Sequence, residues 1–352
     1  MKNASPRSLP RRSHGASLPV RVAPGSRRPL VLSPILALAL GLSLTLSAAI
    51  AAPSAYVKIT PLGSHDGEFC AADRALVFED PDGTRILYDA GRTVRGASDP
   101  RLGKIDAVLL SHLHGDHLGD LHQPAANAGS CAKPDFSVAI TPSSVTEQVA
   151  LAKKSTLFVG GEMASFFARR MKEAGASANQ VQLVRFGGES RIGGVTIASV
   201  PAAHSNGLDP KFLEKGIGDM LSKSALTAYV GPAGGYVVTF SNGLVVYLSG
   251  DTGLIADQDL VVRGFYKAKL AVLNIGGTYS TGPREAAHVI NHLVQPNAVI
   301  ASHANEAATR EGTLLVGTKT MEFKHAVKVP TYLPLSGKTM EFDANGKCVA
   351  GC

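Results

Sequence analysis

The amino-acid sequence predicts an α/β protein in which β-sheets carry helices on their outer faces. Short apolar segments typical of strands occur in groups, give way to helix-forming segments and then return. This order is neither a regular strand–helix alternation nor a pure sandwich of sheets, so it indicates layers of both kinds. With 352 residues, 45% of them hydrophobic and 18% charged, the chain can form one large core, and wholesale disorder is excluded.

The strands behind this prediction lie on both sides of a helical middle. Residues 75–78 and 85–88 are joined by Asp-Pro-Asp-Gly, a strong turn sequence, and residues 235–240 and 244–248 form a second hairpin across Ser-Asn-Gly. The run 105–110 is apolar almost throughout, which suits a strand buried on both faces. The other expected strands are 57–60, 181–184, 195–200, 270–275 and 298–302.

The expected helices fall between these strands. Residues 152–174 mix helix formers, most clearly over 162–173. Residues 283–294 begin with a proline, which is favoured in the first turn of a helix. Residues 205–233 are rich in Gly, Lys and Ser, so we expect an insertion or a loop that covers another part of the molecule.

Residues 1–52 are predicted to be a signal peptide, which leaves 53–352 as one domain. The leader holds seven Lys and Arg and no Asp or Glu, followed by an apolar run and an Ala-rich end. Ala49-Ile50-Ala51 fits the small-x-small pattern of a cleavage site, so we expect trimming near Ala51 or Ala52 and a periplasmic or secreted protein. An uncleaved anchor is the alternative, because the apolar run approaches the length of a membrane span. The pair Arg27-Arg28 leaves export through the twin-arginine route open.

The positive net charge belongs to the leader and not to the domain that follows. Without the seven leader cations, 28 Lys and Arg remain against 28 Asp and Glu. A neutral domain has no basic footprint for nucleic acid. We therefore expect a small-molecule substrate, no nucleic-acid partner, and membrane contact only through an uncleaved leader.

The four cysteines, Cys70, Cys131, Cys348 and Cys352, are compatible with disulfides in an oxidising compartment. Four cysteines permit three pairings, and none has the close C-x-x-C spacing of a structural zinc site. Ordinary disulfides or buried free thiols are therefore expected. The tail from residue 343 is expected to be loosely held.

A cluster of histidines follows the predicted strand 105–110 directly. Here His112, His114, Asp116 and His117 occur within six residues of a chain that has 11 His. Alternate residues of an extended segment point the same way, and a turn at Gly115 can bring the next two side chains close. Neutral imidazole and carboxylate suit Zn²⁺ and similar metals, so this spacing predicts a site for two metals with two ligands each.

The motif His112-x-His114-x-Asp116-His117 resembles the signature of the metallo-β-lactamase superfamily. Later landmarks of that family also occur in the expected order over about residues 57–306, and the last three each follow a predicted strand. These landmarks are Asp89, His204, Asp251 and His303. The resemblance implies a four-layer αβ/βα sandwich, the metallo-β-lactamase fold.

The resemblance also implies two metal ions per chain, Zn²⁺ with Mn²⁺ as the alternative. The first metal would be held by His112, His114 and His204, and the second by Asp116, His117 and His303. Asp251 would bridge the two, and Asp89 would orient a ligand or the metal loop. The expected reaction is hydrolysis by a hydroxide shared between the metals, with Asp116 as the catalytic residue that orients it.

Two segments, 250–254 and 270–287, are similar to the branch of metal-dependent hydrolases related to ascorbate-6-phosphate lactonase. The chain departs from that branch after its last histidine. An aromatic residue and a glycine are usual there, and this chain has Ala304-Asn305-Glu306. Because this turn borders the pocket, the departure puts the branch's substrate in doubt.

These observations predict an exported metal-dependent hydrolase that cleaves a lactone or an ester. A phosphodiesterase, a β-lactamase and a non-catalytic metal-binding module are the alternatives. The secreted β-lactamases lack a bridging aspartate at the position of Asp251. Redox relatives of this fold typically have Glu at the position of His114, and a carboxylate there suits iron, whereas imidazole suits zinc or manganese.

Other polar residues have simpler interpretations. His288 and His292 are expected on an exposed helix face, His65 in an ordinary loop and His122 on a helix surface. Near the landmarks, the candidates for substrate contact are Asn206, Tyr279 and Arg284.

Overall fold

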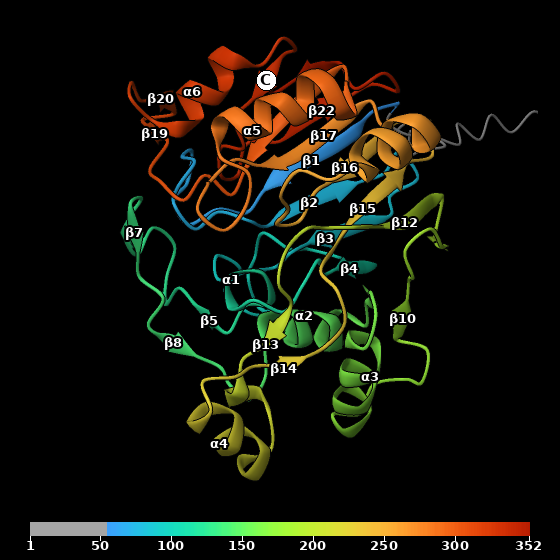
Figure 1. The fold of residues 1–352 in the computed structure, drawn as a ribbon, viewed down its shortest axis with the longest axis vertical. Helices are drawn as coiled ribbons and strands as arrows, with labels where there is room; N and C mark the ends of the chain where they lie inside the picture. The colour runs from blue at the N-terminus through green and yellow to red at the C-terminus, as the bar shows by residue number, and fades with distance from the viewer. Residues whose placement is uncertain (1–54) are drawn as a thin grey trace, which may run out of the picture. The chain divides into compact units, whose positions relative to one another are not determined.

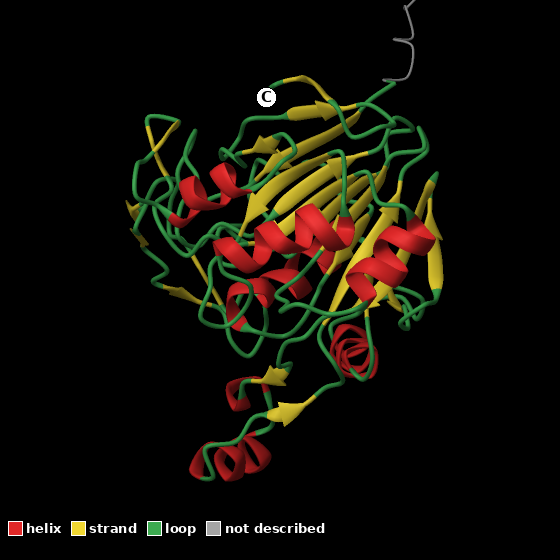
Figure 2. Ribbon diagram, turned by 45° about the horizontal axis from the view of Figure 1, so that its top comes forward, coloured by secondary structure: helices red, strands yellow, loops and turns green. Residues whose placement is uncertain are grey.

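Two β-sheets face each other, and each carries helices on its outer side (Figures 1 and 2). The computed structural model describes residues 55–352, so the predicted signal peptide 1–52 lies outside the described residues. The first sheet has the order β10-β9-β4-β3-β2-β1-β22-β23. Its strands are β1 (Val57–Pro61), β2 (Leu76–Glu79), β3 (Arg85–Tyr88), β4 (Ala107–Leu109), β9 (Thr156–Val159), β10 (Val181–Leu183), β22 (Met340–Phe342) and β23 (Cys348–Ala350).

The second sheet has the order β11-β12-β15-β16-β17-β18-β21. In both sheets, antiparallel hairpins adjoin parallel strands: β2 pairs antiparallel with β3, and β15 with β16, while β16, β17 and β18 run parallel. The strands of the second sheet are β11 (Glu189–Ile192), β12 (Val195–Pro201), β15 (Gly234–Thr239), β16 (Val245–Leu248), β17 (Leu270–Asn274), β18 (Ala298–Ser302) and β21 (Thr331–Tyr332).

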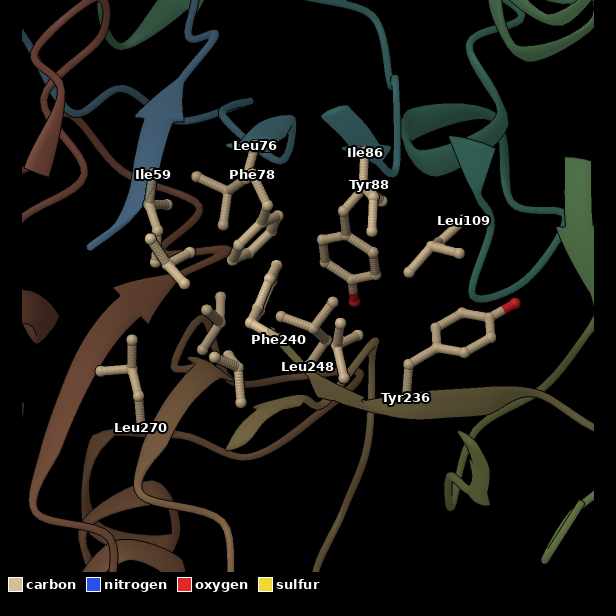
Figure 3. Close-up of a cluster of buried hydrophobic side chains, with 14 of the residues drawn as sticks. Ile59, Leu76, Phe78, Ile86, Tyr88, Leu109, Tyr236, Phe240, Leu248 and Leu270 are labelled. Atoms are coloured by element: carbon tan, nitrogen blue, oxygen red, sulfur yellow. The ribbon is translucent and has the colours of Figure 1, made fainter. Parts of the chain in front are cut away.

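The space between the sheets is filled by apolar side chains from both. Figure 3 shows Phe78 and Tyr88 of the first sheet directed toward Phe240 and Leu248 of the second. These side chains are at most 4% exposed, and burying each contributes roughly 1.5–3 kcal/mol. The strands read as continuous apolar runs because their other faces are covered as well.

Helices cover those other faces. On the first sheet, Val149 of α2 (Val145–Lys153) and Phe167 of α3 (Met163–Glu173) pack against strand residues such as Leu157. On the second sheet the covering helices are η2 (Gln258–Tyr266), α5 (Pro283–His288), its continuation η3 (Val289–Val294) and α6 (Lys319–Ala326). The predicted four-layer αβ/βα sandwich is therefore confirmed.

Most predicted elements occur where the sequence placed them, with three corrections. Residues 152–174 contain the strand β9, because Leu157, Phe158 and Val159 are needed on the buried sheet next to β4. The tail is not loosely held, since β23 pairs with β22. His122 lies in the strand β5 (Leu121–His122), which pairs with β8 (Val138–Ala139), and not on a helix.

The expected insertion 205–233 forms a small structured unit beside the sheets. It holds β13 (Gly207–Leu208), η1 (Pro210–Phe212), α4 (Lys215–Lys223) and β14 (Ala228–Tyr229), and β13 pairs with β14. In Figure 1, α4 lies away from both sheets, beyond α2. The remaining short elements are α1 (Gly115–Leu118), β6 (Gly129–Ser130), β7 (Lys133–Pro134), β19 (Thr309–Arg310) and β20 (Thr313–Leu314).

The cysteines form two disulfides, Cys70–Cys131 and Cys348–Cys352. The first joins the loop before β2 to the loop that carries β6 and β7. The second joins the last strand to the final residue. Between residues 55 and 352, no helix has the length and apolar character needed to cross a membrane.

Candidate metal centre

The predicted ligands follow the ends of strands from both sheets. His112 and His114 follow β4 of the first sheet, and Asp116 and His117 lie in the short helix α1 just after them. The second sheet supplies the other three predicted ligands, each just past a strand: His204 after β12, Asp251 after β16 and His303 after β18.

Two glycines allow these loops to approach one another closely. A Cβ at Gly91 would stand 2.7 Å from the backbone oxygen of Asp116, and a Cβ at Gly250 would stand 2.6 Å from the oxygen of Gly234. Both glycines also have positive φ angles, which side chains rarely adopt. Asp89 and His303 have positive φ as well (41° and 50°), and such strained backbone is concentrated at functional sites.

Three imidazoles form the first group of candidate ligands. His114 Nδ1 lies 3.0 Å from His112 Nε2 and 3.1 Å from His204 Nε2. Their nitrogens all lie within 4.8 Å of one another. This is the set that the family resemblance assigned to the first metal.

Asp116, His117 and His303 form the second group, and the carboxylate of Asp251 lies between the two. His303 Nε2 is 3.3 Å from Asp116 Oδ2. Asp251 Oδ1 is 3.3 Å from His117 Nε2, while Asp251 Oδ2 is 3.1 Å from His303 Nε2 and 3.7 Å from His204 Nε2. The structure thus brings all seven predicted ligands together, with Asp251 in contact distance of both groups.

The donor atoms of this cluster fit metal ions. Within the described residues, buried His117 Nε2, Asp251 Oδ1 and both ring nitrogens of His303 have no hydrogen-bond partner. Leaving one such group unsatisfied costs about 1–3 kcal/mol. Imidazole nitrogens and carboxylate oxygens are the ligands that zinc and related divalent metals take. A bound cation would satisfy the atoms that the protein leaves without partners.

Burial and mutual charge prepare the cluster for a cation. Burial lowers the pKa of His112, His114 and His204, so these rings stay neutral and keep a lone pair free.

The carboxylates act in the opposite sense on the second group. Burial raises the pKa of Asp116 and Asp251, but His117 and His303 outweigh it and hold both values well below the ordinary range. Burial lowers the pKa of His117, but Asp251 and Asp116 outweigh it and raise the value. The carboxylates therefore favour positive charge here, whether it comes from a proton or from a metal.

Asp89 holds the loop after β4, which carries the first four predicted ligands, in position. Its carboxylate accepts hydrogen bonds from the Ser111 amide and hydroxyl, each 2.8 Å long, and from His117 Nδ1 at 2.8 Å. His117 donates its Nδ1 proton through this contact, so Nε2, which faces Asp251, is the nitrogen that a metal would take. The Ser111 hydroxyl lies 2.9 Å from His112 Nδ1 and orients that ring in the same way. The structure thus places Asp89 behind the ligands, where the sequence expected it.

Arg74 is a residue of this centre that the sequence did not reveal. Its guanidinium, with a side chain only 5% exposed, donates to Asp116 Oδ2 at 3.3 Å and to Asn305 Oδ1 at 2.7 Å. The residue precedes β2 and belongs to no recognisable motif, so no local signal could have found it.

A cavity of about 610 Å³ opens over the two ligand groups. Of the three expected substrate-contact residues, Tyr279 lines this cavity, whereas Arg284 is exposed and pairs with Glu285. Asn206 is buried and accepts a hydrogen bond from the Leu113 amide, so it supports the metal loop instead. The cavity lining comprises His114, Asp116, His204, Ser205, Asp251, Gly276, Thr278, Tyr279, His303, Asn305 and Lys319.

Three further histidines, His65, His288 and His292, lie where the sequence predicted. His288 and His292 are both exposed, with ring centroids 4.9 Å apart on the same helix surface. His65 contacts the Ser64 hydroxyl at 3.1 Å within its loop.

Several known proteins are similar to this chain. Residues 84–307 match a family model described as a beta-lactamase superfamily domain. A UPF0173 metal-dependent hydrolase from Cupriavidus metallidurans is 27% identical over 246 residues, covering 66% of this chain and 71% of that protein. A protein of the same name from Pelotomaculum thermopropionicum is 31% identical over 230 residues, covering 65% and 77%.

Among solved structures, Igni18, a metallo hydrolase from Ignicoccus hospitalis, has the same fold. It superposes with a TM-score of 0.54 at 21% identity, covering 82% of this chain and 99% of that one.

The contacts of Asp89 generate a prediction about metal affinity. Asp89→Asn should weaken zinc binding about 10–100-fold, because the amide replaces one of the two accepting oxygens with an NH₂ group that faces a donor, and it carries no charge. Competition with a chromogenic zinc chelator measures the affinity. Asp135→Asn, a change at an exposed aspartate, is the control and should bind zinc as the unaltered protein does. Equal affinity in both variants would show that Asp89 does not support the ligands.

Proposed function

Because the chain belongs to the metallo-β-lactamase superfamily of metal-dependent hydrolases, we propose that it is an exported enzyme that cleaves a lactone or a carboxylic ester. The observation that carries the proposal is the complete set of seven ligands, with both groups open to one cavity. Zn²⁺ is the metal we propose, two ions per chain, with Mn²⁺ as the alternative.

The residues divide into two metal-holding groups that share one carboxylate. His112, His114 and His204 would hold one ion, and Asp116, His117 and His303 the other, with Asp251 contributing to both. When bound, such ions supply a Lewis acid for the carbonyl oxygen and lower the pKa of a bound water to about 7.

Asp116 is the ligand best placed to act on the reacting water. Its side chain is 31% exposed at the cavity, against 6% for Asp251. Arg74 donates to Asp116 Oδ2 and fixes the carboxylate in one orientation. A carboxylate held in this way accepts a hydrogen bond from water and aligns it for attack.

A serine nucleophile is the competing mechanism, and the geometry disfavours it. Ser205 Oγ lies 3.3 Å from His114 Nε2, which has the outline of a Ser–His pair. However, His114 Nδ1 faces the other imidazoles of the first metal group, so a metal bound by Nδ1 would leave the proton on Nε2. A protonated nitrogen donates to the serine and cannot accept its proton.

The proposed chemistry predicts that metal and Asp116 are both required. A chelator should abolish hydrolysis of lactones and esters, and Zn²⁺ or Mn²⁺ should restore it. Asp116→Asn should lower kcat by about 100-fold or more and change KM little, because the loss falls on the step that aligns water. Steady-state kinetics on lactones, esters, phosphodiesters and β-lactams, with zinc content measured alongside, provides the test. Asp135→Asn serves as the matched control.

Each outcome decides a different part of the proposal. Hydrolysis that survives the chelator, or full activity in the Asp116→Asn enzyme, would contradict the metal-dependent mechanism. Cleavage confined to phosphodiesters or β-lactams would retain the mechanism and replace the proposed substrate.

Export is the other part of the proposal. The acid-free basic leader supports it, as does the pairing of all four cysteines in disulfides, which form in oxidising compartments. Mass spectrometry of the protein from the cell envelope or medium should find a mature chain that begins near residue 52 or 53. An intact Met1 form confined to the cytoplasm would contradict export.

A further inference from the structure

Lys319 brings a positive charge to the cavity over the metal centre. Among the residues that line the cavity, Lys319 is the one Lys or Arg, and within residues 55–352 it forms no ion pair with a carboxylate. Its ammonium group donates one hydrogen bond, 2.7 Å long, to the backbone oxygen of Gly276. Because an ammonium group has three donors, two remain for a molecule in the cavity.

The first turn of α6 places Lys319 there, and the turn after His303 fixes this part of the helix. The Glu306 carboxylate accepts hydrogen bonds from the amides of Lys319 (3.0 Å) and Thr320 (2.8 Å). A carboxylate in this position is stabilised by the helix dipole. These amides are therefore satisfied by the protein, and the lysine ammonium is the group left to bind a ligand.

Asn305 adds an uncharged donor to the same wall. Its Oδ1 accepts from Arg74, so its amide nitrogen is the group free to donate, and the residue lines the cavity. Asn305 and Glu306 belong to the turn after His303, where this chain differs from the ascorbate-6-phosphate lactonase branch that it resembles. Asn305 offers a donor to the cavity, and Glu306 holds Lys319 beside it.

The charges in the cavity favour an anion on this wall. The carboxylates that line it are Asp116 and Asp251, both assigned to the metal centre. No lining carboxylate therefore remains to neutralise Lys319. A hydrogen bond from an ammonium group to an oxyanion is shorter and roughly twice as strong as a neutral one.

We propose that Lys319, assisted by the Asn305 amide, binds an oxyanion of the substrate, a carboxylate or a phosphate group separate from the bond that is cleaved. This inference rests on the proposed hydrolase function and narrows it. The substrate is an anionic lactone or ester, held with its charged group on α6 and its reactive carbonyl over the ligands.

The test compares substrates that differ only in this charge. The mono-4-nitrophenyl ester of adipic acid carries a carboxylate, and 4-nitrophenyl hexanoate has the same chain length without one. A phosphonate analogue of the adipate ester separates the two oxyanion classes. The variants are Lys319→Met, which removes the charge, and Lys319→Arg, which keeps it. Lys324→Met is the control, because Lys324 is an exposed lysine on the same helix.

The proposal predicts a selective effect on KM. In Lys319→Met, kcat/KM for a charged ester should fall by about tenfold or more, mainly through KM, while the neutral ester is little affected. Lys319→Arg should recover most of the loss, and Lys324→Met should behave as the unaltered enzyme does. The larger effect, on the carboxylate or on the phosphonate ester, identifies the oxyanion class. An equal loss for neutral and charged esters would show that Lys319 only supports the Gly276 loop, and would overturn the proposal.

A binding measurement keeps this test separate from the proposed function. If the unaltered zinc-loaded protein hydrolyses none of the esters, the proposed ester function fails. Calorimetric titration with succinate and with methylphosphonate then tests the site alone. At least one of them should bind the Lys319→Met protein about tenfold more weakly than the unaltered protein. If the Lys319→Met protein binds succinate and methylphosphonate as tightly as the unaltered protein does, the anion site is contradicted.

Discussion

The Asp251 carboxylate, wedged between His117, His204 and His303, is the contact on which the rest of the centre depends. It is buried, and it lies between a group of three imidazoles and a second group that combines two imidazoles with the Asp116 carboxylate. Carboxylates and imidazoles packed so closely leave several buried atoms without hydrogen bonds. Such a cluster is stable only if a cation enters it or the surrounding fold holds it together.

The four-layer sandwich provides that support through the contact between its sheets. The Tyr88 hydroxyl of the first sheet accepts a 2.9 Å hydrogen bond from the Gly250 amide, immediately before Asp251. The Tyr236 hydroxyl of the second sheet donates to the Leu110 oxygen at 2.8 Å, two residues before His112. Both hydroxyls lie in the apolar core, where a hydrogen bond is strong because water does not compete. The two ligand-bearing edges are thus locked together by bonds through the core.

The sequence could predict what is encoded locally. The spacing of His112, His114, Asp116 and His117 is one motif, and the family resemblance identified the later ligands, each just past a predicted strand. The supporting contacts depend on pairs far apart in the chain: Arg74 reaches Asp116 across 42 residues and Asn305 across 231. Lys319 likewise carries no motif, and its place in the cavity follows from the Glu306 contact with α6. For the same reason β9 was hidden among helix formers, since only its position beside β4 makes it a strand.

The strand ends supply the residues that would act on the bond to be cleaved, and the turn after His303 with α6 supplies the residues that would select the substrate. We expect Asp251 to be shared by two metal ions. Anomalous diffraction from crystals of the zinc-loaded protein, collected across the zinc absorption edge, tests this directly. Two peaks about 3.5–4 Å apart are expected, with an oxygen of Asp251 bound to each. A single peak, or two peaks with Asp251 bound to neither, would contradict it.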